Sequence, residues 1–293
     1  MAQPRVFIVD VFAEEKYAGN QLAVVAGGEA LSSVAMQRIA REMNFSETTF
    51  ILSDQPRDGG YDVRIFTPAA EIPFAGHPTL GTAFVLRDDI LRQRSDTVTL
   101  NLGVGQVPVS FSQDSDGRET VWMRAPQVEL GPIHPSAQFV EVVGLSADDL
   151  DSRFPVQDAS IGVSFTIIPV RTLEAMQRAR FNRVAYDRQA AVRHAQFLFS
   201  TQTYSANNQV HARMFAEPFG VAEDPATGSA NACLGSYLLR HQYIAGDRLD
   251  IRVEQGYEIG RPSLLFVRAE RSGTRAEVSV GGHVVPTFRG ELR

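Results

Sequence analysis

The sequence has very little cysteine and no long apolar segment. Its single cysteine, Cys233, excludes a disulfide within the chain and is typical of a reducing compartment. No segment approaches the roughly 20 consecutive apolar residues that a membrane-spanning helix needs. The start of the chain holds a short apolar stretch without a small-residue cleavage site, so we expect no signal peptide. These features predict a cytoplasmic protein.

An excess of positive charge is also missing. The chain has 28 basic and 34 acidic residues, with a formal net charge of −6. Such a surface gives no electrostatic reason to bind nucleic acid or an anionic membrane. The 6 histidines lack metal-ligand spacing, which argues against a zinc site. What remains is a chain of 293 residues, 44% hydrophobic, long enough for two lobes with full cores.

Hydrophobic spacing predicts a mixture of strands and helices. Alternating or β-branched runs predict strands, whereas apolar residues at helical spacing predict helices. Ser32 or Ser33 can cap the first helix, Asn44 can end it, and Glu47 then lies at a helix-to-strand junction. The expected helices are one around Met36–Met43, Thr79–Leu91, Ala137–Val143, Leu173–Ala179, Tyr186–His194 and Ala230–Arg240.

Two segments half a chain apart share a pattern. Glu71–His77 and Glu223–Ser229 both have the form E-x-P-x-x-G-[H/S] and lead into an apolar helix. The offset is 152 at the glutamate (71 to 223) and again at the glycine (76 to 228). Such an internal repeat predicts two similar lobes. We expect an N-terminal lobe at 1–124 and a C-terminal lobe at 136–293, whose last strand could return to the first. The proline-rich stretch 125–135 would link them.

The repeated helix starts suit an anion. The first N–H groups of a helix have no partner inside the helix, and the helix dipole places positive charge there. Gly76 and Gly228 would let a ligand approach this backbone closely. A substrate carboxylate, or an enolate-like oxygen, is the expected occupant.

Taken in order, several motifs resemble those of one known family. The sequence is similar to the phenazine-biosynthesis isomerase (PhzF-like) family across nearly its whole length. The matching segments are Gly19-Asn20, Asn44–Phe50, Phe66–Thr79, Glu223–Ala230 and Gly256–Ser263.

This resemblance implies an α+β fold of the diaminopimelate-epimerase type. Two pseudo-equivalent lobes would each wrap a mixed β-sheet around a central helix, with the active site between them. The resemblance further implies a homodimer that uses no metal or organic cofactor. Its reference reaction is the isomerisation of a dihydro-hydroxyanthranilate, in which one glutamate moves a proton between two carbons.

The resemblance also assigns roles to individual residues. It implies Glu47 as the acid/base, assisted by His77 and Asp224. The residues it implies for substrate binding are Asn20, Ser46, Gly76, Gly228 and Ser229.

One departure separates this chain from the epimerases of the superfamily. Those enzymes use two cysteines, one just before the glycine at each helix start. Ala75 and Thr227 occupy these places, and Cys233 lies further along the second helix. We therefore expect no two-thiol racemase. A single carboxylate can still remove a proton from one carbon and return it to another on the same face.

Other interpretations stay open for the same residues. Glu47 could pair with Arg41 or Arg64, and His77 could bind only backbone. Asp224 or Ser229 could be a simple helix cap. At the level of function, the alternatives are a binding protein without catalysis and a serine hydrolase using Ser229. The absence of a G-x-S-x-G motif argues against the hydrolase.

Overall fold

The computed structural model describes residues 3–114, 117–188, 194–273 and 275–292. Contacts within the chain divide it into two compact units. The first comprises Met1–Arg124 with Gly281–Arg293, and the second comprises Ala125–Val280. Within the described ranges, no helix is both long and apolar enough to cross a lipid bilayer.

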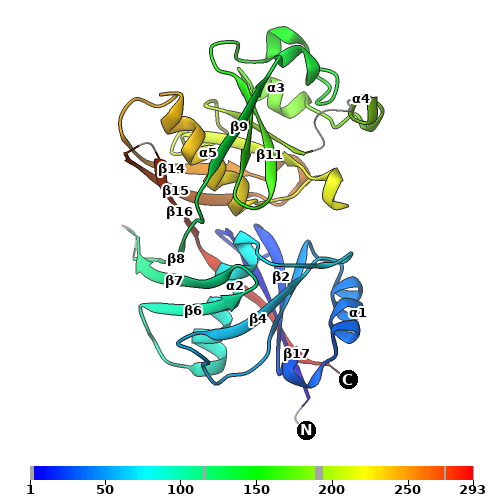
Figure 1. Ribbon diagram of the computed structural model, residues 1–293, viewed down its shortest axis with the longest axis vertical. Coiled ribbons are helices and arrows are strands. Elements are labelled where there is room, and N and C mark those ends of the chain that lie inside the picture. The colour runs from blue at the N-terminus through cyan, green and yellow to red at the C-terminus, as the bar shows by residue number, and fades with distance from the viewer. Residues whose placement is uncertain (1–2, 115–116, 189–193, 274, 293) are drawn as a thin grey trace. The chain divides into compact units, whose positions relative to one another are not determined.

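The first unit is a mixed sheet with two main helices (Figure 1). Its elements are β1 Arg5–Val11, β2 Asn20–Ala26, η1 Gly28–Ala30, α1 Ser33–Met43, β3 Glu47–Ile51, β4 Tyr61–Phe66, β5 Glu71–Ile72, α2 Gly76–Val85, η2 Leu86–Leu91, β6 Thr97–Leu102, β7 Gly105–Gln113, β8 Glu119–Arg124 and β17 Val284–Glu291.

Strand pairing in this unit alternates in direction. β1 pairs antiparallel with β2, β2 parallel with β3, β3 antiparallel with β4, β4 parallel with β6, and β6 antiparallel with β7. β8 adds to β7, and β17 adds to the free side of β1. The sheet surrounds α2, which packs against β1, β2, β3, β6, β7, β8 and β17. A helix enclosed in this way must be apolar all round, and nine of its ten residues are buried.

α1 begins and ends where the sequence predicts. The Ser32 hydroxyl accepts a hydrogen bond from the Ala35 N–H at 3.2 Å, which caps the first turn. Asn44 ends the helix in the left-handed conformation with φ of 54°. The inner face of α1 packs Met36 and Ala40 onto the sheet beside Phe50. β3 then starts at Glu47, so the predicted helix-to-strand junction is confirmed.

The second unit contains the remaining elements. They are β9 Glu129–His134, η3 Ser136–Gln138, η4 Ala147–Asp149, β10 Val156–Ser160, β11 Ser164–Pro169, α3 Leu173–Arg178, α4 Arg183–Arg188, β12 Ala195–Ser200, β13 Val210–Phe215, η5 Glu217–Phe219, α5 Gly228–Arg240, β14 Arg248–Gln255, η6 Tyr257–Ile259, β15 Ser263–Ser272 and β16 Arg275–Gly282.

The second sheet repeats the topology of the first. β10 to β15 pair in the order antiparallel, parallel, antiparallel, parallel, antiparallel, as β1, β2, β3, β4, β6 and β7 do. α5 takes the place of α2 and packs against β9, β10, β11, β14 and β15 (Figure 1). The prediction of two similar lobes, each a mixed sheet around a central helix, is confirmed.

The segment 125–135 is not a plain connection. It includes β9, which pairs antiparallel with β10 around an irregularity where Gly131 and Pro132 lie opposite Asp158. The predicted helix at Ala137–Val143 is wrong, because the short 3-10 helix η3 is followed there by hydrogen-bonded turns and not by an α-helix. α4 covers the start of the predicted helix Tyr186–His194, and residues 189–193 of that prediction lie outside the described ranges.

Candidate active site

Glu47 is held on a rigid frame. It is the first residue of β3, which lies between β2 and β4 and pairs Glu47 with Leu22. Its side chain is only 16% exposed. Asn20 begins β2, two residues before Leu22, and is almost fully buried. Ser46 directly precedes Glu47, so the structure brings these three predicted residues to one end of the sheet.

His77 lies beside Glu47. It is the second residue of α2, is 4% exposed, and its Nε2 atom is 3.4 Å from Glu47 Oε2. Burial lowers the pKa of His77 to about 3, against the raising effect of a hydrogen bond to the Gln21 backbone. The imidazole is therefore neutral near pH 7. Despite the short distance, the contact is then not an ion pair.

The hydrogen bonding of His77 fixes what its ring can do. Its Nε2 is buried and makes no hydrogen bond to the described residues, and the ring also interacts with the Gln21 backbone. A ring proton on Nδ1, donated to that backbone, is the tautomer we assign because it leaves Nε2 unprotonated. The lone pair of Nε2 then faces the carboxyl group of Glu47. This arrangement suits a proton carried by Glu47 rather than by the histidine.

The arginines considered as alternative partners of Glu47 have other contacts. Arg64 donates two hydrogen bonds to Glu71, at 2.7 and 2.6 Å. Arg41 donates to the Pro68 carbonyl.

Both central helices begin without a side-chain cap. Ala75 and Thr227 are the N-cap residues of α2 and α5, both are extended, and neither side chain accepts a bond from its helix. Gly76 and Gly228 follow as buried first residues of these helices. Neither Asp224 nor Ser229 is the N-cap of α5, so the interpretation of either as a simple cap is wrong.

Hydrogen bonds to Met214, Gln255 and Thr227 hold Asp224 in the second unit. Its N–H donates to the Met214 carbonyl at 3.0 Å, and its carbonyl accepts from Gln255 Nε2 at 2.9 Å. Its carboxylate accepts from the Thr227 hydroxyl at 2.5 Å. Ser229, the second residue of α5, remains partly exposed.

Gln255 is a site-supporting residue that the sequence did not reveal. It is fully buried, and its Oε1 accepts from the Thr227 N–H and from Asn231 Nδ2. The next residue, Gly256, has φ of 78°, and a Cβ there would be 2.6 Å from the Pro225 carbonyl oxygen. The motif at Gly256–Ser263 therefore needs its first glycine for close packing against the loop that carries Asp224.

The remaining thiol is unsuited to acid/base work. Cys233 is buried within α5, and burial raises the pKa of its thiol. No group of three or more His, Cys, Asp or Glu side chains in the described ranges is arranged to hold a metal ion.

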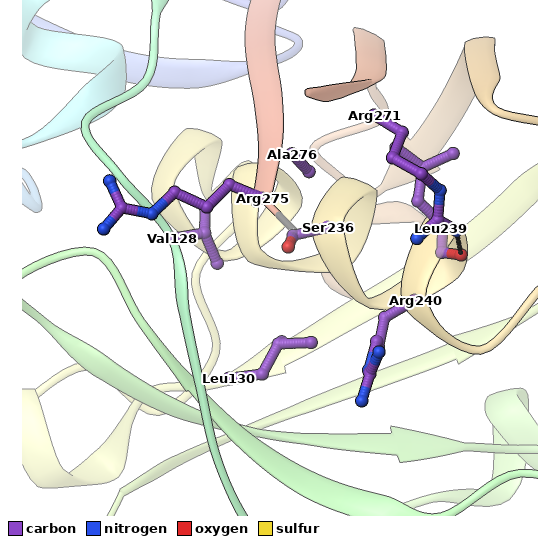
Figure 2. A pocket seen from close by; sticks show the side chains of 8 residues that line it. All are labelled: Val128, Leu130, Ser236, Leu239, Arg240, Arg271, Arg275 and Ala276. Carbon is purple, nitrogen blue, oxygen red and sulfur yellow. Dashed lines mark hydrogen bonds between the residues drawn. The ribbon is translucent and has the colours of Figure 1, made fainter. Parts of the chain in front are cut away.

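A pocket in the second unit has none of the candidate residues among its lining residues. It is formed by α5 and its surroundings, with Ser236, Leu239 and Arg240 among its lining residues (Figure 2). Its arginine side chains do not converge on one point: Arg271 donates to the Leu239 carbonyl, while Arg240 and Arg275 extend in different directions (Figure 2).

Comparisons with known proteins identify the family of the chain. The sequence profile of the PhzC-PhzF family, described as phenazine biosynthesis-like protein, matches residues 9–290. The chain is 34% identical to the trans-2,3-dihydro-3-hydroxyanthranilate isomerase of Pseudomonas aeruginosa, over 95% of each sequence.

Solved structures show the same fold. A phenazine biosynthesis protein of the PhzF family from Bacillus anthracis matches with a TM-score of 0.91 at 26% identity, over 100% of both chains. A hydroxyproline epimerase from Agrobacterium vitis matches at 0.63 and 12% identity, over 99% of this chain and 92% of that one, which indicates a shared fold alone. The protein thus belongs to the PhzC-PhzF family of phenazine biosynthesis-like proteins and is an isomerase.

Proposed function

We propose that this isomerase moves a proton between two carbons of a small cyclic unsaturated carboxylate, with Glu47 as the acid/base. The substrate class is that of trans-2,3-dihydro-3-hydroxyanthranilate, the compound in the name of the P. aeruginosa relative. The observation that carries the proposal is the contact between Glu47 Oε2 and His77 Nε2, where burial keeps the imidazole neutral.

A neutral imidazole suits a glutamate that must first accept a proton. Glu47 removes the proton from one substrate carbon and becomes a carboxylic acid. The lone pair of His77 Nε2 accepts a hydrogen bond from that acid, which stabilises it. Glu47 then delivers the proton to the second carbon and returns to the carboxylate. An imidazolium would instead stabilise the carboxylate and weaken it as a base.

The duplicated topology supports a single carboxylate. Leu22 of β2 pairs with Glu47, the first residue of β3, and Phe165 of β11 pairs with Ala195, the first residue of β12. Ala195 therefore occupies in the second unit the position that Glu47 occupies in the first. An alanine cannot exchange protons, so the two units do not supply a matched pair of bases at this position.

The other predicted residues complete the proposal. We assign Asn20, Ser46, Gly76, Gly228 and Ser229 to substrate binding, and Asp224 to a second carboxylate that assists. Backbone N–H groups at the starts of α2 and α5 would hold negative charge that develops on the substrate. We further propose a cytoplasmic homodimer that needs neither metal nor organic cofactor.

The test compares Glu47→Gln with the wild-type protein. We expect the variant to convert trans-2,3-dihydro-3-hydroxyanthranilate about 10²–10⁴-fold more slowly, because the amide cannot take up the proton. Nuclear magnetic resonance in D₂O measures both the rate and how much protium is transferred within the substrate. Glu42→Gln on the exposed face of α1 is the matched control and should keep full activity. Unchanged turnover in a folded Glu47→Gln protein would refute the role of Glu47.

A further inference from the structure

An arginine–glutamate pair occurs at the same place in both units. In the first, Arg64 Nε and Nη2 donate to the two carboxylate oxygens of Glu71 at 2.7 and 2.6 Å. In the second, Arg213 donates to Glu223 in the same way, at 2.9 and 2.8 Å. Each guanidinium also lies over the ring two residues further on, Phe66 at 5.1 Å in the first unit and its counterpart at 5.0 Å in the second. We call these two pairs the clasps.

The two clasps are topologically equivalent. Arg64 precedes Ile65, which pairs with Ile72 of β5. Arg213 precedes Met214, which forms an antiparallel bridge with Asp224. In each unit the residue that pairs with the arginine-bearing strand, Ile72 or Asp224, directly follows the glutamate. The glutamate also lies five positions before the glycine that starts the central helix (71 to 76, 223 to 228).

The clasp of the second unit is the more buried one. The side chains of Arg213 and Glu223 are 3% and 9% exposed, compared with 26% and 44% for Arg64 and Glu71. Arg213 Nη1 also donates to the carbonyls of Met176 and Ala179 at the end of α3. Exposed ion pairs contribute little, whereas a buried pair that loses one partner leaves a charge without compensation.

We propose that Arg213 is a positioning residue that fixes Asp224 through Glu223. Glu223 and Asp224 are adjacent, so a rigid bidentate bond to one restricts the backbone of the other. The bridge between Asp224 and Met214 is next to Arg213 on β13, which closes a small ring of contacts around the loop. This inference rests on the proposed function only where it assigns Asp224 a role in turnover.

The experiment replaces the planar guanidinium group of Arg213 but keeps its positive charge. In Arg213→Lys a point charge takes the place of the bidentate contact. We expect kcat to fall by about 10- to 100-fold with KM changed much less. A small displacement of a catalytic group slows the chemical step more than it weakens substrate binding. Hydrogen–deuterium exchange over residues 224–230 should become at least about tenfold faster. Arg248→Lys, in the exposed pair with Glu270, is the control and should change neither measurement.

Two further variants separate the outcomes. Glu223→Gln tests the same bond from its other side and should accelerate the same exchange, so a failure of Arg213→Lys to fold does not end the test. In an Asp224→Asn background, Arg213→Lys should lower kcat no further, because both changes act through one carboxylate. Additive losses would show a general structural role and overturn the proposal.

The two proposals can fail independently. If the wild-type protein did not convert the substrate, the proposed function would fail, while exchange at 224–230 would still report on the clasp. If exchange there matched the Arg248→Lys control in both Arg213→Lys and Glu223→Gln, the positioning role would be overturned whatever the activity.

Discussion

At the scale of single residues, the protonation of His77 decides what Glu47 can do. Burial lowers the pKa of His77 to about 3, so its ring stays neutral at every pH where the protein is expected to work. A charged ring at 3.4 Å would hold the glutamate as a carboxylate. The neutral ring can instead accept a hydrogen bond from the protonated acid.

The same shift predicts a pH dependence of stability. The folded pKa of His77 lies below the ordinary value of 6.5, so the unfolded chain binds the extra proton first. Its contribution to the free energy of unfolding is full above pH 6.5. It falls by up to about 1.4 kcal/mol per pH unit as the pH drops towards 3.

Urea denaturation of the wild-type protein and of His77→Gln between pH 4 and 7 checks this prediction. The variant should gain stability relative to the wild type as the pH falls, since glutamine does not titrate. A difference between the two proteins that stayed constant over this range would contradict the depressed pKa.

Sequence reasoning could locate Glu47 but not its contact with His77. The position of Glu47 followed from local signals, namely the αL stop at Asn44 and the β-branched run after it. The contact depends on how α2 packs inside the sheet, which joins residues thirty positions apart. Gln255 could not be found for the same reason, because its partners are Thr227, the N-cap of α5, and Asn231 on that helix.

At the scale of elements, α2 approaches its sheet unusually closely. A Cβ on Gly81 would lie 2.6 Å from Leu22 Cδ2 and 2.8 Å from Val11 Cγ2, and both of these side chains are fully buried. The glycine thus sets the depth at which α2 sits against β1 and β2. His77, one turn earlier on the same helix, depends on that depth for its distance to Glu47.

Gly81→Ala should therefore destabilise the protein by about 1–3 kcal/mol through overpacking. This loss opposes the gain of about 1 kcal/mol that alanine usually brings to a helix interior. Thermal and urea unfolding measure the difference. Gly235→Ala on α5 is the comparison, with closest contacts of 3.0 and 3.1 Å and a smaller expected loss. A Gly81→Ala protein as stable as the wild type would contradict this account of the packing.

The repeat of elements was only partly predictable from the sequence. The E-x-P-x-x-G pattern keeps a constant offset of 152, whereas the clasp arginines are offset by 149 (64 to 213). Nine residues separate Arg213 from Glu223, but six separate Arg64 from Glu71, and the longer loop includes η5. A fixed-offset comparison therefore misses the arginines. β9 could not be predicted for a different reason. It contains Pro132, and a proline argues against a strand, but Pro132 lies at the irregularity in the pairing of β9 with β10, where a proline is tolerated.

At the scale of the whole molecule, chain order and spatial grouping differ in one respect. β17 follows the entire second unit in sequence, yet it pairs antiparallel with β1 from Arg5↔Glu291 to Val11↔Val284. Gly281–Arg293 therefore belongs to the first unit. The prediction that a last strand could return to the first lobe agrees with this pairing.

Ending the chain at Val280 should loosen the first unit specifically. β1 would keep its pairing with β2 but lose β17, and so present an unpaired edge. We expect amide exchange in Arg5–Val11 to become at least about tenfold faster, which corresponds to about 1.4 kcal/mol of lost protection. Exchange in β11 and β12 of the second unit should change much less.

Phe288→Thr controls for the loss of a side chain alone, because Phe288 is 56% exposed and its backbone pairing would remain. Uniform acceleration across both units in the shortened chain would show that they do not unfold separately.

The position of β17 also bears on how the protein is made. During translation the strands β1 to β8 leave the ribosome first, but β17, the second partner of β1, leaves only after all of Ala125–Val280 has been synthesised. The second unit can complete its sheet while the nascent chain is still growing. The unit that carries Glu47 keeps an unpaired edge until the second unit has been synthesised, so the proposed acid/base residue lies in the part of the fold that is completed last.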